Sequence, residues 1–145
     1  MNSLQKVLNW YISLTDSQKI TSQLLLKSTK GGVFRGTVFL NRQLDEVQQT
    51  LQAAQRELSD LIIVSLVAHF EERLASHLGE GFTNLRVAVD RFKTQVHPAT
   101  FEDVQRLCDY RHWVAHGKRW PPPAHADPEL AHMRLSEFLK HSGAD

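Results

Sequence analysis

Apolar residues recur every three or four positions along most of this chain, the spacing that places them on one face of an α-helix. The alternation typical of a half-buried strand appears at Leu85, Val87 and Val89, where we still favour a helix because no partner strand is evident. The pattern therefore predicts an all-α fold, an antiparallel helical bundle of about five helices. The expected helices cover residues 4–26, 42–78, 85–96, 98–116 and 128–140.

The first expected helix contains a candidate boundary. Thr15 followed by Gln18 has the form of a capping box, so residues 4–26 form either two short helices or one bent helix. Gly31 and Gly32 then break the pattern, and residues 33–40 form a loop or a short extended segment.

The second expected helix is the longest, and Asn41 is a good cap for its start. It is either continuous or broken near residues 59–60, and Gly79 and Gly81 end it. Asn84 precedes the third expected helix.

The fourth expected helix starts at Pro98 and runs up to Gly117, a natural residue just beyond a helix end. Residues 120–123 cannot continue a helix, because three of them are prolines, and should form an extended spacer. Asp127 as cap and Pro128 in the first turn open the last helix.

Length and composition agree with one globular domain spanning residues 1–145, since 41% of the residues are hydrophobic and 23% are charged. No apolar run approaches the roughly 20 residues of a membrane span, and no secretory signal is evident. Cys108 is the only cysteine, which favours a reducing compartment. It also lies on the apolar face of its helix, and nothing marks it as an activated nucleophile. We expect a cytoplasmic protein that does not enter a membrane.

Charge is concentrated locally. The net charge of +1 is too small to indicate nucleic-acid binding, but residues 106–120 hold four basic residues and one acid, Asp109. This stretch is either a solvated helix end, where cations complement the helix dipole, or a binding surface for an anion. Its basic residues are Arg106, Arg111, Lys118 and Arg119.

Two charged residues interrupt apolar stripes. Arg111 follows Phe101, Val104 and Cys108 in steps of three and four, and Glu71 takes the same kind of place in the second helix. A guanidinium on an apolar face is costly unless it gains an anionic partner, so we expect Arg111 and Glu71 to pair. Such a pair is either purely structural or part of a functional site.

His116 lies five residues after Arg111, which places the two about 140° apart on an ideal helix. They converge on one ligand only if the helix unwinds at Gly117 or if a second subunit supplies the opposing wall. A histidine beside a fixed cation suits acid or base chemistry at a phosphate.

A metal site is the rival interpretation of the histidines. His112 and His116 stand four residues apart, as metal ligands on a helix do, and His125 and His132 follow. However, Trp113 occupies the place of the glutamate in a zinc-protease motif. We therefore expect no metal and no other cofactor.

The sequence YRHWVAHGKRW at residues 110–120 resembles the motif segment of bacterial HEPN domains, in which an arginine precedes W-x-A-H-G. The spacing from Arg111 to His116 fits the family signature R-x(4 to 6)-H, and the acidic segment AHFEERL at residues 68–74 lies on an earlier helix, as in that family.

The resemblance implies a metal-independent endoribonuclease that dimerises so that two motifs face one cleft, often a toxin or a component of phage defence. Arg111 would then contact the scissile phosphate, and His116 would transfer protons during attack by the RNA 2′-hydroxyl. His112 and Glu71 would support them, and Lys118, Arg119 and Arg106 would bind RNA.

Two positions differ from the family pattern. His112 stands where asparagine is frequent, which keeps a polar donor next to Arg111. An antitoxin or nucleotidyltransferase-type partner is also known in the family, but Lys118 replaces the tyrosine through which the nucleotidyltransferase acts. The alternatives to a ribonuclease are a catalytically silent module of this type, which binds a nucleotide or a partner protein, and a plain helical interaction domain.

Overall fold

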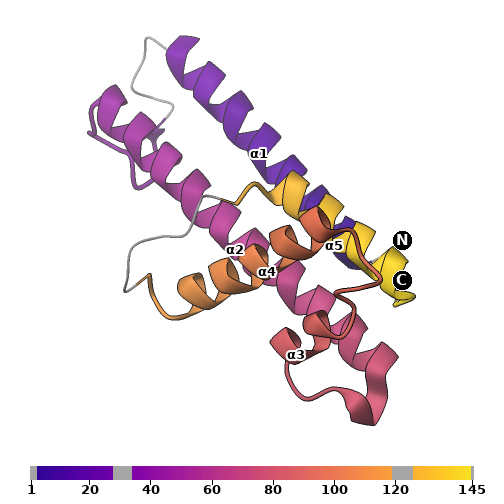
Figure 1. The fold of residues 1–145 in the computed structure, drawn as a ribbon. Helices are drawn as coiled ribbons and strands as arrows, with labels where there is room; N and C mark the ends of the chain where they lie inside the picture. Colours follow the sequence, from indigo (N-terminus) through magenta and orange to yellow (C-terminus); the bar gives the residue numbers. More distant parts are fainter. Residues whose placement is uncertain (1–2, 28–33, 119–125, 145) are drawn as a thin grey trace.

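A computed structural model describes residues 3–27, 34–118 and 126–144. Within these ranges all regular secondary structure is helical, and Figure 1 shows the helices packed as a bundle. The predicted all-α helical bundle is confirmed. Its elements are α1 (Ser3–Lys27), α2 (Leu44–Leu78), the 3-10 turn η2 (Gly79–Gly81), α3 (Leu85–Asp90), α4 (Pro98–Ala115) and α5 (Pro128–Ser142).

The 35-residue helix α2 is the centre of the fold. It packs against α1, α3, α4 and α5, whereas α5 also packs against α1 and α4. Helices α1 and α2 run antiparallel and project together beyond the others (Figure 1). Along the projecting first part of α2, from residue 44 to 58, only Val47 is buried, so the core lies in the other half of the bundle.

The buried side chains form one cluster to which all five helices contribute. Its centre is aromatic: the ring of Phe138 meets those of Phe70 and Phe92 edge to face, with centroids 5.4 and 6.0 Å apart. Such edge-to-face contacts are favourable because the positive edge of one ring meets the negative face of another.

The capping box expected at Thr15 is wrong, because α1 continues through this residue without a break. The Thr15 hydroxyl instead accepts a hydrogen bond from Gln55 Nε2 of α2, at 3.0 Å. Packing against α2 therefore keeps helical a segment whose local sequence also allows a boundary.

The second helix is continuous through residues 59–60, but its expected cap is wrong. Gln43, without a side-chain hydrogen bond, precedes the first turn of α2, and Asn41 adopts a left-handed conformation with φ 65° in the turns before it. Residues 34–41 form these turns, with the rings of Phe34 and Phe39 in contact, and no strand.

Several predicted helix ends are confirmed by hydrogen bonds. The side chains of Asn84 and Asp127 accept from the backbone N–H groups of Val87 and Leu130, at 3.0 and 2.9 Å. Gly79 ends α2 as expected. The helix expected over residues 85–96 ends early, at Asp90, and continues as turns.

No helix in the described part of the chain is long and apolar enough to span a membrane. The expected proline spacer at residues 120–123 lies outside the described residues.

Candidate functional site at the end of α4

The motif segment lies where α4 stops. Gly117, with φ 71°, donates its N–H to the Val114 carbonyl at 3.0 Å, and Lys118 donates to the Trp113 carbonyl at 3.1 Å. This pair of bonds is the Schellman arrangement, which needs a left-handed residue that glycine supplies without strain. The predicted helix end at Gly117 is confirmed, and His116 becomes the C-cap rather than a residue of the helix.

The buried face of α4 differs from the expected one. It runs through Val104, Leu107, Tyr110 and Trp113 in steps of three, because α2 and α5 cover this side of the helix. Arg111 therefore lies beside the buried face rather than on it, and Ala115 is exposed.

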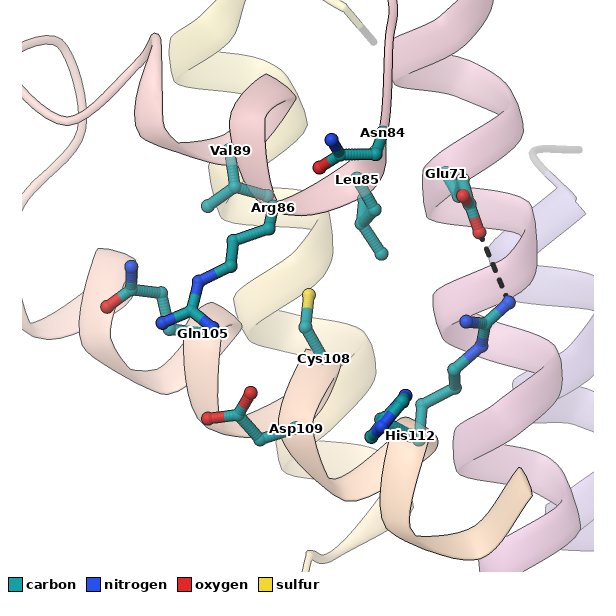
Figure 2. A pocket seen from close by; sticks show the side chains of 10 residues that line it. Glu71, Asn84, Leu85, Arg86, Val89, Gln105, Cys108, Asp109 and His112 are labelled. Atoms are coloured by element: carbon teal, nitrogen blue, oxygen red, sulfur yellow. Dashed lines mark hydrogen bonds and ion pairs between the residues drawn. The ribbon is translucent and has the colours of Figure 1, made fainter. Parts of the chain in front are cut away.

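Arg111 pairs with Glu71 as the sequence predicts. Its Nη2 lies 3.4 Å from Glu71 Oε2 of α2, and Figure 2 draws this contact as a dashed line. The pair is not fully buried, since 36% and 30% of the two side chains remain exposed. Water and a ligand can therefore reach the guanidinium, most of whose five N–H donors are not used by Glu71.

The two motif histidines are neighbours. The imidazole rings of His112 and His116 have centroids 4.2 Å apart and are tilted by 56°. Both side chains are exposed. Arg111 and His112 line the same cavity, and the ring of His112 contacts that of His116, so His112 connects the guanidinium to the second imidazole.

This cavity, of about 370 Å³, opens between α2, α3 and α4. Figure 2 shows its side chains converging from the three helices. Arg111 and His112 form part of its wall, whereas His116 does not. The full lining consists of Glu71, Asn84, Leu85, Arg86, Val89, Gln105, Cys108, Asp109, Arg111 and His112.

The thiol of Cys108 points into the cavity from α4 (Figure 2). Burial, with a smaller contribution from the nearby carboxylate of Asp109, raises the pKa of this thiol to about 12. It is therefore protonated at neutral pH and acts as part of an apolar wall, not as a nucleophile.

A second charged cluster fixes the motif segment to α2, and the sequence analysis missed it. Lys118 Nζ lies 2.6 Å from Asp60 Oδ2 and 2.8 Å from Glu57 Oε1, and the Tyr110 hydroxyl donates to Asp60 Oδ1 at 2.6 Å. The ammonium also lies 5.6 Å from the centre of the Trp113 ring. Only 8% of the Asp60 side chain is exposed, so this carboxylate depends on both partners.

These contacts shift two ionisation equilibria. The hydrogen bonds of Lys118 with Asp60, and then with Glu57, raise the pKa of its ammonium. Burial first, and the bond to Asp60 second, raise the pKa of the Tyr110 phenol. The one signal in the sequence is the polar residue Asp60 in an apolar stretch of α2, a pattern that by itself indicates only a helix break.

The basic residues expected to bind RNA are not equivalent. Lys118 is held by the two carboxylates, whereas Arg106 keeps 71% of its side chain exposed and makes only contacts of 3.4 Å or longer to Asp103 and Glu102. Arg119 lies outside the described residues.

No three histidine, cysteine or carboxylate side chains gather into a potential metal site in residues 3–27, 34–118 and 126–144. Comparison with known proteins finds no match to a family model, to a curated protein or to a solved structure.

Proposed function

We propose that this protein is a metal-independent endoribonuclease that cleaves RNA through attack of a 2′-hydroxyl on the adjacent phosphate. The observation that supports it best is the cluster of half-exposed Arg111 with the exposed residues His112 and His116, in which Arg111 and His112 share a cavity wall and the two imidazole rings lie 4.2 Å apart. The resemblance of residues 110–120 to the HEPN motif points to the same chemistry.

This reaction needs a base, a cation and an acid, and the cluster offers two imidazoles and one guanidinium for these three roles. A base takes the proton from the 2′-hydroxyl, a cation stabilises the charge that builds up on the phosphate, and an acid protonates the departing 5′-oxygen. Imidazole is the side chain best suited to proton transfer near neutral pH, and guanidinium matches the geometry of two phosphate oxygens.

We assign the phosphate contact to Arg111 and a proton transfer to His116. His112 supplies the second imidazole, so that one ring accepts a proton while the other donates one. The O2′–P bond forms as the P–O5′ bond breaks, which leaves a 2′,3′-cyclic phosphate and a 5′-hydroxyl. Glu71 holds one edge of the Arg111 guanidinium and leaves the other donors for the substrate.

RNA is the proposed partner, and Arg106, with 71% of its side chain exposed, is proposed to contact a more distant phosphate of the same strand. A second copy of the chain is the proposed assembly partner, because one arginine and one pair of imidazoles cover only one side of a phosphate. A role as a toxin or in phage defence agrees with the motif resemblance, and an antitoxin would then be a further partner.

The cavity favours a second candidate, a silent module that binds a nucleotide without cleaving RNA. A volume of about 370 Å³ lies in the range of small-molecule sites. Nucleotide binding in the absence of any RNA cleavage would support this candidate over the enzyme.

The decisive experiment compares the purified protein with His116→Ala on a mixed-sequence RNA in the presence of EDTA. We expect the parent to cleave and His116→Ala to be inactive with an unchanged circular dichroism spectrum, because the imidazole is exposed. His141→Ala, which removes an exposed histidine from α5, is the matched control and should cleave normally.

Product analysis completes the test. Cyclic phosphate and 5′-hydroxyl ends support attack by the 2′-hydroxyl. Cleavage by His116→Ala at the parent rate would overturn the mechanism. Loss of cleavage in EDTA with recovery in zinc would instead make His112 and His116 metal ligands.

A further inference from the structure

The cavity beside the cluster carries a pair of charges that the proposed reaction does not use. Arg86 extends from α3 towards α4, and Asp109 belongs to α4 (Figure 2). Neither side chain forms a hydrogen bond or an ion pair with another side chain in the described part of the protein. A cation and an anion that face one cavity without pairing with each other are complementary to a ligand with both acceptors and donors.

Part of the remaining cavity wall is apolar. Leu85 and Val89 of α3 are buried and present their side chains to it, and the un-ionised thiol of Cys108 faces them from α4. An apolar wall with a few polar groups at its rim is typical of small-molecule sites.

The side-chain amides of Asn84 and Gln105, at the rim of the cavity, each form one hydrogen bond within the protein. Asn84 uses its Oδ1 to cap α3, and Gln105 donates its Nε2 to Asp90 Oδ1 at 3.1 Å. These bonds fix the orientation of both side chains and leave the Asn84 amide nitrogen as a donor and the Gln105 carbonyl as an acceptor.

We propose that this cavity is a guanine-binding subsite for the nucleotide next to the cleaved phosphate. The proposal rests on the proposed function for the placement of the phosphate, because Arg111 and His112 belong to the same wall. The guanine base lies against the apolar wall, Arg86 donates to one of its edges, and Asp109 accepts from another.

Guanine is favoured over the other bases by hydrogen-bonding chemistry. An arginine binds two neighbouring acceptors best, and O6 and N7 of guanine are such a pair. A carboxylate binds two neighbouring donors best, and N1–H and the N2 amine of guanine are such a pair. Adenine, cytosine and uracil each lack two adjacent donors on their pairing edge, so Asp109 discriminates against all three.

The protein is titrated with GMP, AMP, CMP and UMP, and the methyl resonances of Leu85 and Val89 are followed by NMR. We expect GMP to shift these resonances and to bind at least about tenfold more tightly than the other nucleotides. Asp109→Asn and Arg86→Met should each weaken GMP binding by about tenfold or more. Asp45→Asn and Arg56→Met, which change exposed charges of α2 outside the cavity, are the matched controls.

Equal affinity for the four nucleotides, or GMP binding unaffected by both cavity variants, would overturn the guanine site. The failure of the ribonuclease proposal can be told apart from the failure of the guanine site. If GMP binds in a manner that depends on Asp109 but no RNA is cleaved, the ribonuclease is rejected and the guanine site is retained. RNA cleavage without preference for guanosine, together with no binding of GMP, would retain the ribonuclease and reject the subsite.

Discussion

The position of Arg111 shows how a small change of register alters the role of a charged residue. Tyr110, the residue immediately before Arg111, lies on the buried face of α4 and is 4% exposed, whereas the side chain of Arg111 remains 36% exposed. A guanidinium fully buried with Glu71 would serve stability alone. The half-exposed guanidinium can leave part of its donor set to an anion.

We predict that Arg111→Ala abolishes RNA cleavage but lowers the free energy of unfolding by only about 1 kcal/mol or less, because partly exposed ion pairs contribute little. Urea denaturation and a cleavage assay on the same preparation measure both effects. Glu71→Gln breaks the same ion pair but keeps the guanidinium, so it should match the stability loss and reduce cleavage far less than Arg111→Ala does. A loss of several kcal/mol in both variants would show that the pair is part of the core.

The thiol of Cys108 gives a second prediction at this scale. Since burial raises its pKa from 9.0 to about 12, the contribution to stability is present below pH 9 and is lost as the pH rises towards 12. We expect iodoacetamide to alkylate the folded protein slowly at pH 9 and the urea-unfolded protein rapidly, because the thiolate is the reactive form. Equal rates in the two states would contradict the raised pKa of this half-buried thiol.

At the scale of the elements, the end of α4 is held by more than its own hydrogen bonds. Lys118 has a left-handed φ of 56°, which a non-glycine residue adopts at a cost, and its ammonium reaches back to Asp60 and Glu57 of α2. This tether fixes the turn that carries His116, and it occupies the ammonium of a lysine that the motif resemblance assigns to RNA binding.

We predict that Lys118→Met lowers the free energy of unfolding by up to about 3 kcal/mol, because it leaves the buried Asp60 carboxylate without its cation. Lys140→Met, at an exposed position in α5, should change stability little. Adding Asp60→Asn to Lys118→Met should recover part of the loss, which a double-mutant cycle in urea measures. Additive effects of the two substitutions would show that the tether contributes nothing.

The same tether has a defined dependence on pH. The pKa of Lys118 is raised in the folded state, so its contribution is complete below the usual value of 10.5 and disappears as the pH rises through the folded value. It is therefore intact at neutral pH, where cleavage is measured.

At the scale of the whole molecule, the cluster and the cavity lie on one side of the bundle and face outwards. A phosphate bound to Arg111 and the two imidazoles would remain open to solvent on its far side. A two-fold assembly would place a second, identical cluster opposite the first and exclude this water.

We predict that cleavage depends on dimerisation. Specific activity should rise with protein concentration and reach a plateau where sedimentation equilibrium shows the dimer. Mixing an excess of inactive His116→Ala with the parent should change the activity per parent chain, because mixed dimers form. Constant specific activity over a range in which the protein is monomeric would contradict a shared site.

The sequence alone determined features that depend on neighbours along the chain. Asn84, Asp127 and Gly117 mark helix ends because a short polar side chain satisfies a free N–H and a glycine accepts positive φ, wherever the helix packs. The period of the apolar residues likewise fixed the all-α bundle. Two charges on apolar stripes predicted the Arg111–Glu71 contact, since an unpaired charge there is costly.

Only the tertiary structure decided what depends on neighbours in space. A helical period does not specify which of several adjacent faces is covered, and the packing of α2 and α5 on α4 placed Tyr110, not Arg111, in the core. The contact with Gln55 keeps α1 helical at Thr15. Lys118 and Tyr110 bind the buried carboxylate of Asp60, so α2 continues through this residue and the motif segment is attached to it. The cavity exists because α3 and α4 meet over α2, a geometry that no local pattern of residues encodes.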